Sequence, residues 1–356
     1  MTTKSSPSLV RSFWFPATLT VLILAFVGIL SGVAALFICF VLVILEVTFS
    51  FDNAVVNAKV LEHMSPFWQK LFLTVGIFIA VFVVRFALPI FIVQLTTGLG
   101  FLEVADLAIT DPAQYGRELT AAGPMIEAFG GTFLLMIALS YFFDNEKDIH
   151  WLPFERQLAA VGRFDNIGIG VMLAAAVAIY FTVSPDERSV VFVAAVLGLL
   201  LHIVLDLFDS FFEKELEEDE HGGVKVKVGM AAFSSFLYLE VLDASFSFDG
   251  VIGAFAITIS VLLIVAGLAA GAVWVRSMTV HLVRTKTLGK FAYLENGAFW
   301  AILALGVVML LKLYHIELPE VVTGSIGLTF IGASVWWSVR EAKKHKKNGE
   351  RELITV

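Results

Sequence analysis

The feature that most constrains this chain is a succession of apolar runs, most of them long enough to cross a lipid bilayer. A helix needs about 20 mostly apolar residues to span the hydrocarbon core. We therefore predict an all-α, polytopic membrane helix bundle with about ten transmembrane helices, or about nine if the short first run only enters the membrane. The runs lie near residues 17–32, 34–58, 71–95, 124–143, 167–183, 190–211, 232–257, 258–280, 293–313 and 319–339, the seventh and eighth being divided near Ser260.

Composition excludes several classes of protein. With 58% hydrophobic and 16% charged residues, a water-soluble fold would expose large apolar patches. The net charge of −8, with no dominant basic face, argues against a nucleic-acid partner. Cys39 is the only cysteine, which excludes disulfides and thiolate metal cages. No protease, hydrolase or nucleotide-binding motif is present, so we expect neither an enzyme nor a prosthetic group.

Positive charges in short loops predict the orientation. Lysines crowd the tail after Arg340, whereas the stretch from Gly98 to Gly123, expected to hold a short interfacial helix, is acidic. We predict a multi-pass inner-membrane protein with both termini in the cytoplasm. Its segments are an N-terminal helix (1–33, an uncleaved anchor rather than a signal peptide), a first repeat with extra helices (34–213), an acidic cytoplasmic loop (214–229), a second, inverted repeat (230–340) and a basic tail (341–356).

An acidic motif occurs once in each half of the chain. Glu46 precedes Phe-Ser-Phe and then Asp52, and Asp243 precedes Phe-Ser-Phe and then Asp249, so that the acids lie six residues apart in both copies. An odd number of predicted spans separates the copies, which therefore cross the membrane in opposite directions. This pattern is typical of inverted-topology repeats, whose shared site lies near the membrane midplane.

A second pair of acids follows the same rule. Glu127 near the start of the fourth run and Glu295 near the start of the ninth are each expected about one turn inside the membrane. An intramembrane charge costs several kcal/mol and normally lines a pathway or meets a cation. We therefore predict a cage of carboxylates formed by Asp52, Asp249, Glu127 and Glu295, with Asn53 as a neutral ligand.

Helical periodicity places Glu46, Ser50 and Asn53 on one face, and Asp243 and Ser247 on the matching face of the second copy. Asp52 and Asp249 lie about 120° away from their partner acids in an ideal helix. Either the helices unwind locally, at Asn53 and at Gly250, or the two acids of each copy face different neighbours. Local unwinding is favoured because it occurs at transporter ion sites.

Oxygen ligands without cysteine suit Mn²⁺, Ca²⁺ or Mg²⁺ rather than Zn²⁺ or Cu⁺. Carboxylates crowded in a low dielectric cannot all stay ionised, so some should bind protons when the metal leaves. The alternative is a structural role, in which the acids pair with intramembrane cations such as Arg85 or Lys312. His202 and Asp206 form a further polar stripe, which is either a second pathway for ions or a helix end emerging into water.

The motifs at Glu46–Asn53 and Asp243–Asp249 resemble those of the TerC family of bacterial membrane proteins, within the LysE-like transporter group. The resemblance covers roughly residues 34–313, and the length is more like that of a longer, uncharacterised branch. It implies metal export, chiefly of manganese, with links to tellurite resistance. One departure is Gly250, which stands where the first copy has Asn53.

We therefore expect a transporter that exports Mn²⁺ in exchange for protons, with the metal ion, protons and the bilayer as its partners. The alternative is a membrane scaffold or stress-complex component whose acids are structural. The sequence leaves the oligomeric state open.

Overall fold

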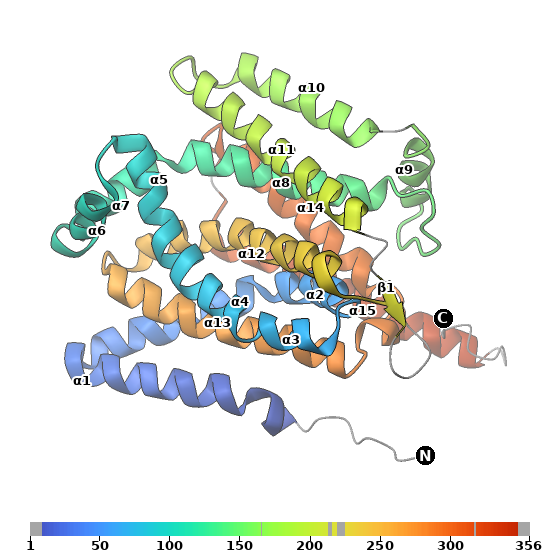
Figure 1. Cartoon of the computed structure of the whole chain (residues 1–356), viewed down its shortest axis with the longest axis horizontal. Helices are drawn as coiled ribbons and strands as arrows, with labels where there is room; N and C mark the ends of the chain where they lie inside the picture. The colour runs from blue at the N-terminus through green and yellow to red at the C-terminus, as the bar shows by residue number, and fades with distance from the viewer. Residues whose placement is uncertain (1–8, 165, 213–215, 219–224, 317, 348–356) are drawn as a thin grey trace. The chain divides into compact units, whose positions relative to one another are not determined.

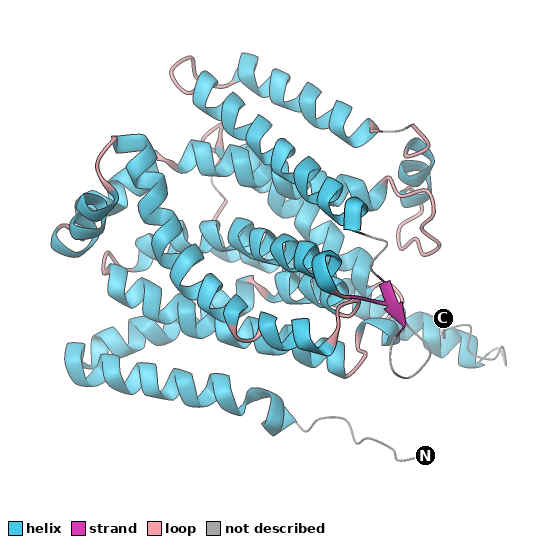
Figure 2. Cartoon of the chain, viewed as in Figure 1, coloured by secondary structure: helices cyan, strands magenta, loops and turns pink. Residues whose placement is uncertain are grey.

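A computed structural model describes residues 9–164, 166–212, 216–218, 225–316 and 318–347, which are almost entirely helical (Figures 1 and 2). This confirms the all-α membrane-type fold. The helices are α1 (Leu9–Phe49), α2 (Phe51–Leu61), α3 (Pro66–Phe72), α4 (Val75–Phe78), the π-helix η1 (Ile79–Ala87), α5 (Leu88–Thr97), α6 (Phe101–Thr110), α7 (Pro112–Ala121), α8 (Gly123–Phe142), α9 (Glu155–Val161), α10 (Ile167–Thr182), α11 (Arg188–Phe212), α12 (Gly229–Ile257), α13 (Val261–Arg284), the 3₁₀-helix η2 (Leu288–Lys290), α14 (Leu294–Lys312) and α15 (Glu320–Lys347).

Fewer helices than expected are suited to crossing a membrane. Within the described residues six are long and apolar enough, which indicates a membrane-embedded protein, so the predicted count of ten is wrong by this measure. One reason is that a single stretch, Ser12–Phe49, takes up two of the predicted runs. In addition, α10 has only 16 residues, and α12 carries Glu240, Asp243 and Asp249 inside its apolar sequence.

The expected boundary between the first two runs is present inside α1. Gly32 has φ 85° and ψ 176°, a non-helical conformation that favours glycine, and it divides α1 into two helical parts. Val27 before this point and Ala35 and Cys39 after it belong to one buried cluster, so the second part folds back along the first. The division expected near Ser260 is confirmed, because α12 ends at Ile257 and Ser260 caps the start of α13.

The acidic motifs differ from expectation in where the helix breaks. In the first copy the interruption is at Ser50, between α1 and α2, rather than at Asn53. In the second copy α12 runs without a break through Gly250, so unwinding there is wrong.

The third run is not one regular helix. The chain from Pro66 to Thr97 passes through α3, α4, the nine-residue π-helix η1 and α5. The acidic segment after α11 is also less irregular than expected. It contains the antiparallel strands β1 (Leu216–Glu218) and β2 (Lys225–Lys227), and Lys227 bonds through its backbone to His63 and Ser65.

The chain divides into two compact units. The first comprises Met1–Ala54, Val60–Gly123 and Phe212–Thr285, and the second comprises Val55–Lys59, Pro124–Phe211 and Lys286–Val356.

Within the first unit, α13 packs closely along α1 through two glycines one turn apart. A Cβ atom on Gly267 would lie 2.5 Å from Leu42 Cβ, and one on Gly271 would lie 2.5 Å from Glu46 Cβ. Small residues spaced by four allow helix backbones to approach in this way in membrane proteins. The consequence for the site is that Glu46 is held against α13.

Within the second unit, glycines likewise set the helix contacts. A Cβ on Gly131 of α8 would lie 3.0 Å from Leu310 of α14, and one on Gly306 of α14 would lie 2.8 Å from Leu135 of α8. Gly297 of α14 packs on Ser334 of α15.

Candidate functional site

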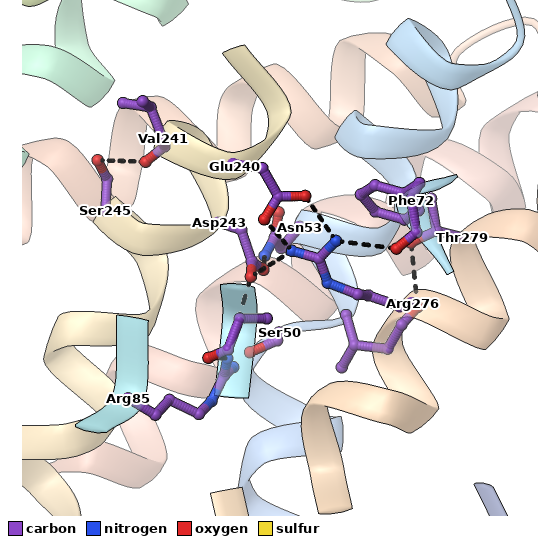
Figure 3. Close-up of polar contacts among 12 residues, drawn as sticks. Ser50, Asn53, Phe72, Arg85, Glu240, Val241, Asp243, Ser245, Arg276 and Thr279 are labelled. Atoms are coloured by element: carbon purple, nitrogen blue, oxygen red, sulfur yellow. Dashed lines mark hydrogen bonds and ion pairs between the residues drawn. The ribbon is translucent and has the colours of Figure 1, made fainter. Parts of the chain in front are cut away.

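The first unit holds a set of five buried charged side chains, here called the ion network: Glu46 of α1, Arg85 of η1, Glu240 and Asp243 of α12, and Arg276 of α13. Figure 3 labels all of them except Glu46. All are no more than 6% exposed. Charges at this depth persist only when they are paired and hydrogen-bonded, and here each one has an ionic partner.

Arg276 is held on several sides. Its Nη1 and Nη2 atoms donate to the two Glu240 oxygens at 2.8 Å each, and Nη2 also donates to Asp243 at 3.0 Å. Nη1 further donates to the carbonyl oxygen of Phe72 at 3.2 Å, and the guanidinium lies 4.3 Å from the Phe72 ring centroid. Space for it comes from Gly76, where a Cβ atom would lie 2.3 Å from Arg276 Nη1. The pairing of Arg276 with Glu240 therefore depends on glycine at position 76.

Arg85 makes fewer contacts. Its Nη2 donates to Glu46, which also accepts a bond from Ser50 Oγ at 3.1 Å. Its Nη1 donates to the carbonyl oxygen of Ala80 on its own helix at 2.9 Å and lies 3.9 Å from Asp243.

Two reciprocal contacts show how the motif copies face each other. Asn53 of the first copy donates through Nδ2 to Asp243 of the second at 2.8 Å. A Cβ on Gly250, the counterpart of Asn53, would lie 3.5 Å from Glu46 of the first copy. The end of the first copy thus meets the start of the second, and the end of the second meets the start of the first. The two segments therefore run antiparallel, as inverted repeats require. The inverted repeat itself remains a prediction.

Buried acids outnumber buried bases in this unit. Among its described residues the buried acids are Glu46, Asp52, Glu240 and Asp243, and the buried arginines are Arg85 and Arg276. Asp52 accepts the backbone N–H of Asn53 at 3.0 Å. Two buried oxygens, Asn53 Oδ1 and Ser247 Oγ, have no hydrogen-bond partner among the described residues. The described part of the first unit therefore buries more acids than arginines and holds two buried oxygens without a hydrogen-bond partner.

Glu46, Ser50, Asn53 and Asp243 come together as the periodicity predicted, and Arg85 pairs with Glu46 as the structural alternative predicted. The Asp249 side chain lies outside the described part of the chain. The other candidate residues belong to the second unit, where Glu127 is half-buried and Glu295 pairs with Lys59 at 3.0 Å.

The polar stripe on α11 also lies in the second unit. His202 is buried, and its Nε2 lies 3.2 Å from Ser140 Oγ, whereas Asp206 is exposed. Across all described residues, no three His, Cys, Asp or Glu side chains are grouped so as to hold a metal ion. The predicted cage therefore remains a prediction.

A family model described as "Protein of unknown function (DUF475)" matches residues 51–345. The chain belongs to the DUF475 family. The match includes every member of the ion network except Glu46. No curated protein and no solved structure matches the chain. The TerC name is not supported by these comparisons, so a relation to TerC remains a proposal.

The DUF475 chain holds a second buried carboxylate site, in its second unit, that the sequence did not reveal. Glu155 of α9 accepts bonds from Asn296 Nδ2 at 2.7 Å, Trp300 Nε1 at 2.7 Å, the Trp151 backbone at 3.0 Å and Lys147 Nζ at 3.4 Å. We call these five residues the Glu155 cluster.

Lys147 also lies 3.8 Å from the centroid of the Tyr141 ring, which stacks on Phe299. Burial lowers the pKa of Lys147, and the Glu155 carboxylate offsets part of that change.

Arg276 is the other residue that was not predicted from the sequence of this DUF475 protein. A signal was available, since an arginine inside an apolar run requires a buried acid, and the closely packing glycines Gly271 and Gly267 stand before it in the same run.

Proposed function

We propose that this DUF475 protein moves a divalent cation across a membrane. The observation that supports it is the imbalance in the first unit, where four described acids, Glu46, Asp52, Glu240 and Asp243, are buried with two arginines. An uncompensated carboxylate in a low dielectric costs several kcal/mol, which a bound cation would relieve.

The chemistry of the acceptors favours a hard cation. The candidate ligands are carboxylate oxygens, with the amide oxygen of Asn53 and the hydroxyl of Ser247 as neutral additions. These donors suit Mn²⁺, Ca²⁺ or Mg²⁺ rather than Zn²⁺ or Cu⁺. Mn²⁺ is the first candidate because the motif resembles that of TerC proteins.

Exchange with protons follows from the same imbalance. When the cation leaves, the surplus carboxylates take up protons because desolvation and mutual repulsion disfavour their ionised forms. In a bacterial inner membrane, with both termini in the cytoplasm, proton entry would drive metal export. Binding of the metal would in turn release protons.

The alternative is a membrane scaffold, favoured by the observation that Glu46, Glu240 and Asp243 all pair with arginines. A scaffold moves no ions. The two functions therefore differ in one measurable property.

The test is manganese flux through the purified full-length protein in liposomes that enclose a manganese-sensitive dye, with and without a pH gradient. Flux should depend on the gradient, and Asp52→Asn should abolish it because the substitution removes a charge at constant volume. Asp186→Asn, which changes an exposed acid between α10 and α11, is the matched control and should transport normally.

Metal binding in detergent should also weaken as pH falls, with heats that differ between buffers of different ionisation enthalpy. Absence of flux in the wild type would leave the scaffold as the better account. Equal flux in the wild type and in Asp52→Asn would show that transport does not use the Asp52 carboxylate.

A further inference from the structure

The two arginines of the ion network occupy equivalent places in the repeat but are bound differently. Each lies in the helical run that follows its own copy of the motif, Arg85 after Glu46 and Arg276 after Asp243. Arg276 forms a two-point pair with Glu240, a bond to Asp243 and a contact with the Phe72 ring.

The reason for the difference is one position in the sequence. Glu240 lies three residues before Asp243, and the residue three before Glu46 is Val43. The first copy therefore lacks the carboxylate that clamps the arginine of the second. Arg85 has a single close carboxylate, Glu46, and Asp243 lies farther away, at 3.9 Å.

The backbone around Arg85 differs as well. Arg85 lies in the π-helix η1, whereas Arg276 lies in the regular α-helix α13. π-helical turns are less stable than α-helical ones and occur frequently at functional sites. A return of η1 to α-helical geometry would rotate Arg85 relative to the residues before it, and would move its guanidinium away from Glu46.

An unused acceptor belongs to Asn53, the residue bonded to Asp243, whose carboxylate lies 3.9 Å from Arg85. The buried Asn53 side chain donates Nδ2 to Asp243, which leaves its oxygen without a donor among the described residues. A cation that replaced the Arg85 guanidinium would find Glu46, Asp243 and this amide oxygen as ligands.

We propose that Arg85 is a built-in counter-cation, which occupies the carboxylates of Glu46 and Asp243 while no substrate cation is bound and leaves them when one binds. Arg276 stays in place throughout. The identity of the substrate cation rests on the proposed function. The exchange of one cation for another at Glu46 does not depend on it.

The experiment uses the full-length protein in detergent, with guanidinium and Mn²⁺ as separate probes. Arg85→Ala vacates the guanidinium position, so low concentrations of guanidinium should raise its thermal unfolding temperature and leave the wild type unchanged. Mn²⁺ should bind Arg85→Ala about tenfold or more tightly than the wild type, because a competing unit charge within about 4 Å has gone. It should also displace guanidinium.

Two controls make the result specific. Arg117→Ala removes an exposed arginine from α7 and should show neither effect. Glu46→Gln combined with Arg85→Ala removes the acceptor together with the cation, and guanidinium should not stabilise it.

The outcomes separate the two proposals. If guanidinium stabilises only Arg85→Ala while no variant binds Mn²⁺, the counter-cation stands and the manganese function fails. If the wild type transports Mn²⁺ while Arg85→Ala shows unchanged affinity and no response to guanidinium, the counter-cation is wrong. Should Arg85→Ala not fold, Arg85→Lys keeps the charge on a shorter reach and should bind Mn²⁺ severalfold more tightly; unchanged affinity there overturns the proposal.

Discussion

The ion network of the first unit and the Glu155 cluster of the second both bury carboxylates, yet they differ in balance. Glu155 accepts four bonds, three from neutral donors and one from Lys147, and both of its oxygens are used. In the described part of the first unit, four acids and two arginines are buried, the arginines pair with Glu46, Glu240 and Asp243, and Asn53 Oδ1 has no donor. Burial alone therefore does not indicate function. A saturated acid stabilises the fold, and a surplus of acid suggests a site for a cation.

The largest expected effect is on Arg276, and it tests whether part of the network is structural. Arg276→Gln leaves Glu240 and Asp243 without their cation in a buried setting, and should destabilise the protein by about 3–5 kcal/mol. Denaturant unfolding in micelles measures this. Adding Glu240→Gln removes one unpaired charge and should restore part of the loss; strict additivity of the two effects would contradict a direct pair.

A smaller effect is expected at Gly76, which provides the space for that pair. A Cβ atom there would lie 2.3 Å from Arg276 Nη1 and 2.7 Å from Glu240 Oε1, so Gly76→Ala should cost about 1–3 kcal/mol. The control is Gly170→Ala in α10, where no atom lies within 4 Å of the new Cβ. It should be neutral or stabilising because alanine favours helices. Equal effects at both sites would show that Gly76 makes no special room.

Glu155 tests the other half of the comparison, that a carboxylate with all its bonds satisfied has a structural role only. Glu155→Gln replaces one carboxylate oxygen, an acceptor, by an amide NH₂ group, which is a donor. That group would face an N–H donor in place of an acceptor, so the substitution should cost about 1–3 kcal/mol of stability. Manganese flux per folded molecule should not change. A loss of flux at full stability would mean that the Glu155 cluster belongs to the transport pathway and that the contrast between the units is false.

The smallest effect is expected at Tyr293, whose hydroxyl donates to Glu341 at 2.9 Å. Burial and this acceptor raise the pKa of Tyr293 from 10.0 to about 12. The folded state thus holds this proton more tightly, and the stability it adds is complete below pH 10 and is lost as pH rises toward 12. Tyr293→Phe should cost about 0.5–1.5 kcal/mol at neutral pH and should lack that alkaline loss. If the difference in unfolding free energy between the wild type and Tyr293→Phe stays constant from pH 9 to about 12, the hydrogen bond from Tyr293 to Glu341 is not the cause.

Much of the architecture could be predicted because it depends on local sequence. The boundary at Gly32 and the division at Ser260 follow from residues that interrupt an apolar helix. The antiparallel relation of the two motif copies followed from the parity of the runs between them. The π-helix around Arg85 could not be predicted, since no spacing of apolar residues distinguishes it from an α-helix.

The pairing of the charges was beyond the sequence. The expected cage of Asp52, Glu127 and Glu295 remains a prediction, whereas the pairing of Arg276 with Glu240 and Asp243 is known only from the fold. Glu155 looked like one acid among several in a polar loop, and only the fold brings Asn296, 141 residues away, to its carboxylate.

The sequence by itself determined the membrane character and the helical class, because the length of an apolar run acts within a few turns of helix. Only the tertiary structure decided that Arg276 is clamped and Arg85 is held by one close carboxylate. Those contacts depend on which helix faces meet, and that is set by packing between residues such as Gly271 and Glu46, far apart in the chain.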